Sequence, residues 1–281
     1  MGLSTGTEQP AQRHDGRVSE AFNPVDGTRI AYQETGTGSP IVLVHGSALS
    51  RAIWRGFGYV KALRDDHRLI LVDMRGHGLS GKPHGQADYA MSLVIEDLLA
   101  VYEAADIPAA HFMGYSFGAR VGFSLADSHP ERMLSFISAG GTYRIDEGAV
   151  SSLFFPGYDE ALESGGMRAF VNGWEAQAGV TIDPATTNAF LANDPVALQA
   201  YFRQLAVEQG VEEKRLTGIR TPTLLLAGTD DRQRYLDSER AAGLMPNARF
   251  EPLPGRGHGD TLFPSGPVLE LVKGFLAEQP V

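Results

Sequence analysis

The sequence predicts an α/β protein built around a parallel sheet. Short apolar runs typical of buried strands recur along the chain, and segments with helical periodicity separate them. In addition, one apolar strand runs through Gly114-Tyr115-Ser116-Phe117-Gly118 directly into a helical segment. Because strands that alternate with helices return through right-handed crossovers, this pattern predicts a parallel sheet flanked by helices.

The N-terminal part is interpreted as a lead-in followed by an antiparallel hairpin. Residues 1–16 are polar, and we expect them to be a disordered lead-in. Val18–Phe22 and Thr28–Glu34 are predicted strands, and the turn sequence Asn23-Pro24-Val25-Asp26-Gly27 joins them.

The buried strands are recognised by continuous β-branched and aliphatic residues, as expected where both faces of a sheet are covered. Four such runs occur, at Pro40–Val44, Arg68–Val72, Leu134–Ser138 and Thr223–Ala227. A short apolar stretch before Ser116 and another at Ala248–Pro252 complete the predicted strands.

Helical periodicity is clearest from Asp88 to Ala105, with Asp88 as a candidate N-cap. The apolar face of this helix is formed by Val94, Leu98 and Val101. A further helix is expected at Ala119–Asp127, after the Ser116 turn, and a last one at about Pro267–Ala277.

The alternation of strand and helix stops after Ser138. From about Gly141 to Arg215 helix signals dominate, among them Asp183-Pro184 and Asp194-Pro195, each an N-cap followed by proline at the first helical position. We therefore predict a helical cap at 141–215, inserted between the sixth and seventh strands of a core formed by 17–140 and 216–281.

Composition excludes several classes of function. The chain has 281 residues, a formal net charge of −10 and no cysteine. The negative charge argues against nucleic acid and anionic membrane surfaces as partners, and the missing thiols exclude disulfides, thiolate catalysis and cysteine-ligated zinc. The N-terminus has no apolar signal core and no stretch is long enough to span a membrane, so we expect a cytoplasmic protein with a small-molecule substrate.

Ser116 is the candidate nucleophile. A sharp turn from strand to helix exposes the serine hydroxyl over the sheet edge, close to the positive end of the helix. The turn is crowded, and Gly114 and Gly118 supply the flanking positions that must have almost no side chain.

The candidate base and acid follow later strands. His258 lies in Pro254-Gly255-Arg256-Gly257-His258-Gly259, between the strand at Ala248–Pro252 and the last helix. The acid is expected in the loop after Thr223–Ala227, where Asp231 is preferred to Asp230, with Asp146 of the cap as a third choice. Since loops at the carboxyl ends of parallel strands meet in one crevice, these residues are predicted to converge on Ser116.

Two backbone amides are the candidate oxyanion hole: that of Phe117, which follows the nucleophile, and that of Ser47, which follows the strand at Pro40–Val44. His45 is interpreted as a brace for this loop. Asp73 and His77 could suggest a metal site, but their run is glycine-rich without a third ligand, so we expect a structural loop and no metal.

Five motifs occur in the order typical of the α/β-hydrolase superfamily, which the chain resembles from about residue 20 to the C-terminus, the insert excepted. They are Pro40–Gly46, Asp73–Ser80, Gly114–Gly118, Gly228–Asp231 and Gly257-His258. The resemblance implies an eight-stranded, mostly parallel sheet, a helical cap and no cofactor.

Ser116 departs from the haloalkane dehalogenase and epoxide hydrolase branches, which attack through a carboxylate. His45-Gly46-Ser47 is similar to the run in carbon–carbon bond hydrolases, but Ala48-Leu49-Ser50 replaces the glycine–proline continuation of that branch.

These observations predict a serine hydrolase that cleaves a small or medium carboxylic ester or lactone through an acyl-enzyme. Cap aromatic residues favour an apolar or aromatic substrate group: Phe154, Phe155, Phe170, Trp174 and Phe190. The alternatives are a carbon–carbon bond hydrolase, a perhydrolase or cofactor-free oxygenase on the same scaffold, and a small-ligand receptor without turnover. The sequence leaves the oligomeric state open.

Overall fold

The predicted α/β fold is confirmed in a computed structural model, which describes residues 14–145 and 148–279. Eight strands form one sheet in the order β1-β2-β4-β3-β5-β6-β7-β8. β2 runs antiparallel to both of its neighbours, and all other pairs are parallel. The strands are β1 (His14–Phe22), β2 (Arg29–Gly36), β3 (Ser39–Val44), β4 (His67–Val72), β5 (Ala110–Tyr115), β6 (Met133–Ala139), β7 (Thr223–Gly228) and β8 (Ala248–Leu253).

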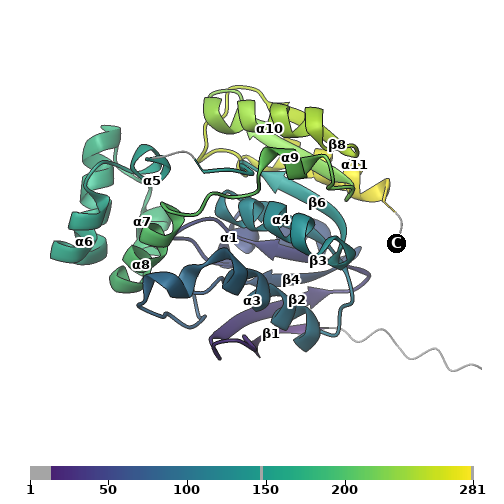
Figure 1. The fold of residues 1–281 in the computed structure, drawn as a ribbon, viewed down its shortest axis with the longest axis horizontal. Helices are drawn as coiled ribbons and strands as arrows, with labels where there is room; N and C mark the ends of the chain where they lie inside the picture. The colour runs from purple at the N-terminus through teal and green to yellow at the C-terminus, as the bar shows by residue number, and fades with distance from the viewer. Residues whose placement is uncertain (1–13, 146–147, 280–281) are drawn as a thin grey trace, which may run out of the picture.

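Helices cover both faces of the sheet (Figure 1). One face packs against α1 (Ala52–Gly56), α2 (Tyr59–Leu63) and α11 (Ser265–Ala277). The other packs against α3 (Met91–Ala104), α4 (Phe117–Ser128) and α10 (Arg232–Leu244). Because both faces are covered, the central strands are buried along almost their whole length, which explains their continuous apolar sequences.

A group of helices lies between β6 and β7 in the chain, at one end of the sheet (Figure 1). It consists of α5 (Ala149–Leu153), α6 (Tyr158–Ala178), α7 (Pro184–Leu191) and α8 (Pro195–Leu205), and α9 (Glu213–Leu216) leads back to the core. Asp183 and Asp194 cap α7 and α8 as predicted, since each carboxylate accepts two backbone N–H groups of the first turn. None of the helices described at 14–145 and 148–279 has both the length and the apolar character of a membrane span.

Two local predictions are wrong. β1 begins at His14, so residues 14–16 of the predicted lead-in belong to this strand, and His14 and Asp15 pair with β2; the rest of that segment, 1–13, lies outside the described residues. Asp88 does not cap the following α-helix. It lies in a 3₁₀ helix, Gln86–Tyr89, where its carboxylate accepts the Gly85 N–H at 3.0 Å. The first N–H of α3, on Met91, donates instead to Glu208 at 3.0 Å, a partner far along the chain that local sequence does not reveal.

The turn between β5 and α4 is packed closely against the end of β3. A Cβ atom at Gly118 would lie closer than 3.0 Å to the carbonyl oxygens of Val44 and His45, and one at Gly114 would collide with the Gly118 carbonyl. Only glycine therefore allows α4 to begin against the end of β3.

Gly118→Ala is expected to lower the free energy of unfolding by about 1–3 kcal/mol, because the added methyl group meets backbone that has no free space to move into. Gly274→Ala in α11 is the matched control, since nothing lies within 4 Å of its added Cβ. Alanine is the better helix former, so this control is expected to stabilise by roughly 0.5–1 kcal/mol. Urea unfolding of both variants measures the difference; equal effects would contradict the packing argument.

Candidate active site

Ser116 lies at the junction of β5 and α4 in a strained backbone conformation, with φ +54° and ψ −113°. For a residue other than glycine this costs about 1–3 kcal/mol, which the surrounding packing must offset. The conformation turns the hydroxyl away from the sheet, and Ser116 Oγ lies 2.9 Å from His258 Nε2.

His258 joins Ser116 to Asp231. The imidazole comes from the loop after β8, and its Nδ1 lies 2.8 Å from Oδ2 of Asp231, which precedes α10. Nδ1 therefore carries the proton that Asp231 accepts, and Nε2 is left as the acceptor for the serine hydroxyl. The structure thus brings together the three predicted side chains.

The other predicted acids are not at this position. Asp230 is exposed; its carboxylate accepts the Thr229 hydroxyl at 3.3 Å, and its N–H donates to the Arg256 carbonyl at 3.0 Å. Asp230 thus belongs to the turn between β7 and α10 and does not contact the imidazole. Asp146 lies outside the described residues.

Arg234 completes the charge arrangement around the acid, and sequence reasoning missed it. It lies in the first turn of α10 and pairs with Asp231 Oδ1 at 3.2 Å. Burial raises the pKa of Asp231, but the hydrogen bond with His258 and the Arg234 charge outweigh it and hold this pKa below its ordinary value. Burial, together with the Arg234 charge, lowers the pKa of His258 despite the opposing effect of Asp231. The imidazole is consequently neutral at neutral pH.

Tyr115 holds His258 from a second side. The two rings stack with centroids 5.6 Å apart and an interplanar angle of 20°, and the Tyr115 hydroxyl donates to the His258 carbonyl at 3.0 Å. The residue before the candidate nucleophile thereby fixes both the ring and the backbone of the candidate base.

The loop His45–Ser47 packs directly against the nucleophile turn. A Cβ atom at Gly46 would lie 3.1 Å from Ser116 Cβ. Gly46 is thus in close approach to the candidate nucleophile, and the amide of Ser47 belongs to the next residue. Phe117 is the first residue of α4, where N–H groups have no acceptor within the helix. The Ser47 hydroxyl is 2.6 Å from that of Tyr201 in α8, a contact between core and cap that sequence reasoning missed.

Asp73, His45 and His77 brace these loops. His45 Nε2 accepts the Met74 N–H and His77 Nε2 accepts the Ala48 N–H, each at 3.1 Å, while Asp73 pairs with Arg51. Burial lowers the pKa of His77 to about 3, so this ring is a neutral acceptor. In the part of the chain that the structure describes, no group of three or more His, Cys, Asp or Glu side chains is arranged to hold a metal ion.

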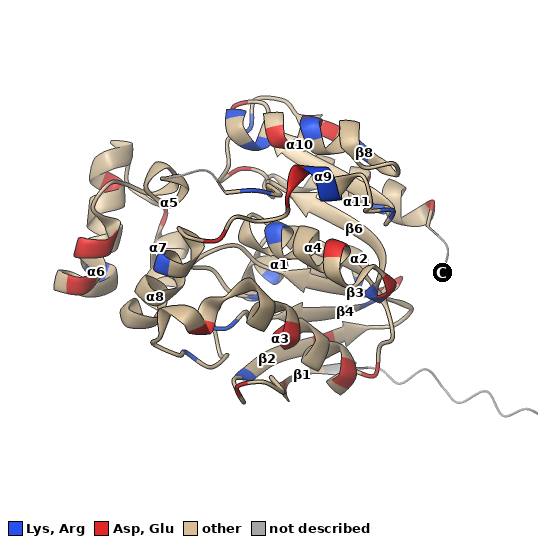
Figure 2. Cartoon of the chain, in the orientation of Figure 1, with Lys and Arg blue, Asp and Glu red and all other residues tan. Residues whose placement is uncertain are grey.

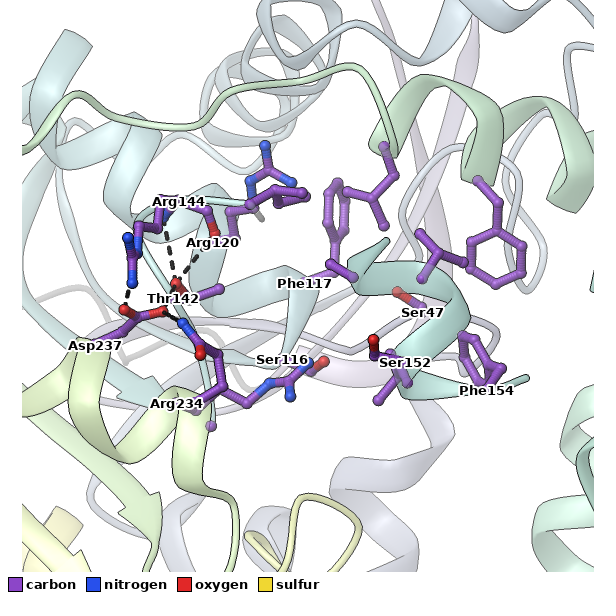
Figure 3. A pocket seen from close by; sticks show the side chains of 18 residues that line it. Ser47, Ser116, Phe117, Arg120, Thr142, Arg144, Ser152, Phe154, Arg234 and Asp237 are labelled. Carbon is purple, nitrogen blue, oxygen red and sulfur yellow. Dashed lines mark hydrogen bonds and ion pairs between the residues drawn. The ribbon is translucent and has the colours of Figure 1, made fainter. Parts of the chain in front are cut away.

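A pocket of about 230 Å³ opens over Ser116 between the core and the cap (Figure 3). Figure 3 shows Thr142, Arg144 and Asp237 toward one side of this pocket and Phe154 toward the other. The lining also includes apolar residues and Ser152 from the segment between β6 and β7, and polar residues of the core. The apolar residues are Ile145, Val150, Leu153, Phe202 and Leu205, and the polar core residues are Ser47, Arg120, Gln233 and Arg234.

The predicted cap aromatic residues divide into two groups. Phe154 lines the pocket, whereas Phe170 and Phe190 stack on each other with centroids 6.2 Å apart inside the cap. Trp174 packs on Phe190 at 5.0 Å. Most of this aromatic set therefore holds the cap helices together and leaves one wall of the pocket apolar.

Arg120 and Arg144 also line the pocket, and sequence reasoning missed both. For Arg120 a signal was available, because it is a charged residue one helical turn after Ser116 in an otherwise apolar stretch, Phe117–Phe123. Arg144 lies in the segment that enters the cap, where no periodicity marks the direction of a side chain.

The chain is similar to several known hydrolases. A family model described as alpha/beta hydrolase fold matches residues 39–166. A putative carbamate hydrolase RutD of Pseudomonas syringae pv. syringae (strain B728a) is 30% identical over 233 residues, which cover 78% of this chain and 86% of that protein. A 2-hydroxymuconate semialdehyde hydrolase of Pseudomonas sp. (strain CF600) is 27% identical, covering 90% of this chain and 92% of that one.

The solved structure of the esterase RhEst1 from Rhodococcus sp. ECU1013 has a TM-score of 0.76 and 26% identity, covering 94% of this chain and 99% of that one. All of these proteins are named as hydrolases or esterases. The similarity covers 78–94% of this chain in these three proteins. Together with the eight-stranded sheet and the position of the helical insert, it shows that the chain belongs to the α/β-hydrolase superfamily.

Proposed function

We propose that the protein hydrolyses a small carboxylic ester or lactone through an acyl-enzyme on Ser116. The observation that carries this proposal is the continuous chain of hydrogen bonds from Ser116 Oγ to His258 Nε2, 2.9 Å, and from His258 Nδ1 to Asp231, 2.8 Å. A serine hydroxyl becomes a competent nucleophile when a neutral imidazole accepts its proton and a carboxylate holds that imidazole in one tautomer.

In the first half of the reaction, Ser116 Oγ attacks the substrate carbonyl carbon as its proton moves to His258 Nε2. The carbonyl π electrons move to oxygen, and the amides of Phe117 and Ser47 stabilise the resulting oxyanion. One such donor contributes about 10²–10³ in rate. The imidazolium, stabilised by Asp231, then gives its proton to the departing alkoxide, which leaves Ser116 acylated.

In the second half, water takes the place of the alcohol. His258 accepts a proton from water, the hydroxide oxygen attacks the acyl carbon, and the proton returns to Ser116 Oγ when the acid is released. Because the pocket is small and one of its walls is apolar, it suits compact acyl groups.

A second candidate is hydrolysis of a carbon–carbon bond in a conjugated keto acid. The relative named 2-hydroxymuconate semialdehyde hydrolase and the run His45-Gly46-Ser47 favour it. In that reaction the same serine, base and oxyanion donors would serve, so product analysis separates the two candidates.

A fluorophosphonate reagent is expected to add one label per chain, on Ser116, and Ser116→Ala is expected to abolish the label and lower ester turnover at least about 10⁴-fold. Mass spectrometry of the intact and digested protein locates the label. The control is Ser164→Ala on α6, where the hydroxyl donates to its own helix at 2.7 Å and the label should persist. Labelling that survives Ser116→Ala would rule out this nucleophile.

Asp231→Asn is expected to lower kcat by about 10²–10⁴, because an amide stabilises neither the imidazolium nor the tautomer that Ser116 needs. Asp230→Asn is the matched control one residue away and should change kcat less than about threefold, since its carboxylate faces Thr229. Steady-state kinetics on one ester, with circular dichroism to verify folding, compares them. A larger loss in the Asp230 variant would reverse the assignment.

Ester turnover is expected to rise with pH, because His258 accepts a proton only when it is neutral. The midpoint of this rise should lie below pH 6.5, because the pKa of His258 is lowered. Arg234→Gln removes one of the causes and should move the midpoint to higher pH. Activity recovered at pH 7 after exposure to each buffer controls for acid inactivation. A flat profile between pH 5 and 8, or a shift to lower pH in the variant, would contradict a histidine base.

A further inference from the structure

Arg120 is a buried cation in the wall of the pocket. It is 2% exposed, and none of its three guanidinium nitrogens meets a hydrogen-bond acceptor within the part of the chain that the structure describes. The other two arginines of the pocket differ in this respect. Arg144 pairs with Asp237 at 2.9 Å and Arg234 pairs with Asp231 at 3.2 Å.

The position of Arg120 makes a charge without a hydrogen-bond acceptor especially unfavourable. It lies in the first turns of α4, where the helix dipole already places positive charge. Burial lowers its pKa to about 10, so the guanidinium remains charged at neutral pH. A buried charge without a partner destabilises the folded protein, and a bound anion would offset this destabilisation.

Neither of the two groups that attract the Arg120 charge, Tyr201 and Glu208, supplies the missing acceptor. Glu208 attracts the charge, but its Oε1 accepts the Met91 N–H and the Gln204 amide, each at 3.0 Å. The Tyr201 hydroxyl is bonded to Ser47. The donors of Arg120 are therefore left for a group that enters the pocket.

Arg120 and Ser116 are one helical turn apart. The Arg120 N–H donates to the Ser116 carbonyl at 3.1 Å, and both residues line the same pocket. Asp and Glu are spread over the helices and loops of this acidic chain (Figure 2), whereas the pocket lining holds three arginines against one acidic residue, Asp237. A negatively charged ligand is thus attracted to the point where the reaction is proposed to occur.

We propose that Arg120 binds a carboxylate of the substrate, so that the pocket selects esters or lactones that carry a second, free carboxylate. A planar guanidinium matches a carboxylate through two parallel hydrogen bonds, and one unpaired cation balances one negative charge. The reaction itself rests on the proposed function, whereas the anion site rests on Arg120. Half-esters of short dicarboxylic acids are the simplest substrates of this class.

The kinetic test compares esters that differ only at the far end of the acyl chain. Monoethyl glutarate is paired with ethyl pentanoate, and monoethyl adipate with ethyl hexanoate, with acid release followed by pH-stat. The wild type is expected to prefer the carboxylate member of at least one pair about 10- to 100-fold in kcat/KM, mostly through KM. Arg120→Met should reduce that ratio to roughly 1.

Arg168→Gln is the matched control, because it removes one positive charge from an exposed position on α6. Its ratio should stay within about twofold of wild type, which separates a specific contact from general attraction. A wild-type ratio near 1 at both chain lengths, or an equal loss in Arg168→Gln, would overturn the anion site.

A binding measurement distinguishes failure of the anion site from failure of the proposed reaction. Calorimetric titration of Ser116→Ala with monoethyl adipate should show binding that weakens at least tenfold when Arg120→Met is added. Arg120-dependent binding without hydrolysis of any ester by the wild type would overturn the proposed function and leave the anion site standing. Ser116-dependent hydrolysis of both members of each pair at equal rates would support the proposed function and overturn the anion site.

Thermal unfolding without ligand tests whether Arg120 has a merely structural role. Methionine fills the volume of the aliphatic stem without charge, so Arg120→Met is expected to raise Tm by at least about 2–4 °C. A lower Tm with an unchanged selectivity ratio would assign the guanidinium to packing and overturn the proposal.

Discussion

The close approach of α4 to the end of β3 is the constraint on which the rest of the structure depends. Gly118 lies against the carbonyls of Val44 and His45, and this contact places the first turn of the helix directly over the β3 loop. Ser116 takes its strained conformation in this turn, and the amides of Phe117 and Ser47 belong to the two segments that meet there. A hydroxyl and two proposed oxyanion donors thereby become neighbours through backbone packing alone, before any side chain of the cap contributes.

The sequence was informative where a local pattern is sufficient. Continuous apolar runs identify strands covered on both faces, and Asp-Pro pairs identify the starts of α7 and α8 because the capping groups are adjacent in the chain. The convergence of Ser116, Asp231 and His258 could be predicted since parallel strands deliver their following loops to one edge.

The sequence failed where the decisive partner is remote. Asp88 has the composition of an N-cap, yet the first N–H of α3 bonds to Glu208, 117 residues away. The contact between Ser47 and Tyr201, and the isolation of Arg120 beside paired arginines, are likewise properties of three-dimensional neighbours. A sequence pattern does not indicate whether a buried guanidinium has a hydrogen-bond acceptor near it.

The bonds that join the cap to the core are unevenly distributed. Tyr201 and Glu208, within and just after α8, bond to Ser47 and Met91 of the core, and Asn193, just before it, donates to the Ala48 carbonyl at 2.8 Å. α6 packs on α7 and α8, and its axis is interrupted at Gly166. The stretch around α8 is therefore bonded directly to the core, including the loop at Ser47, whereas α6 is held mainly by its packing on α7 and α8. Substitutions in α6 can therefore reshape the cap while the geometry at Ser116, His258 and Asp231 is preserved.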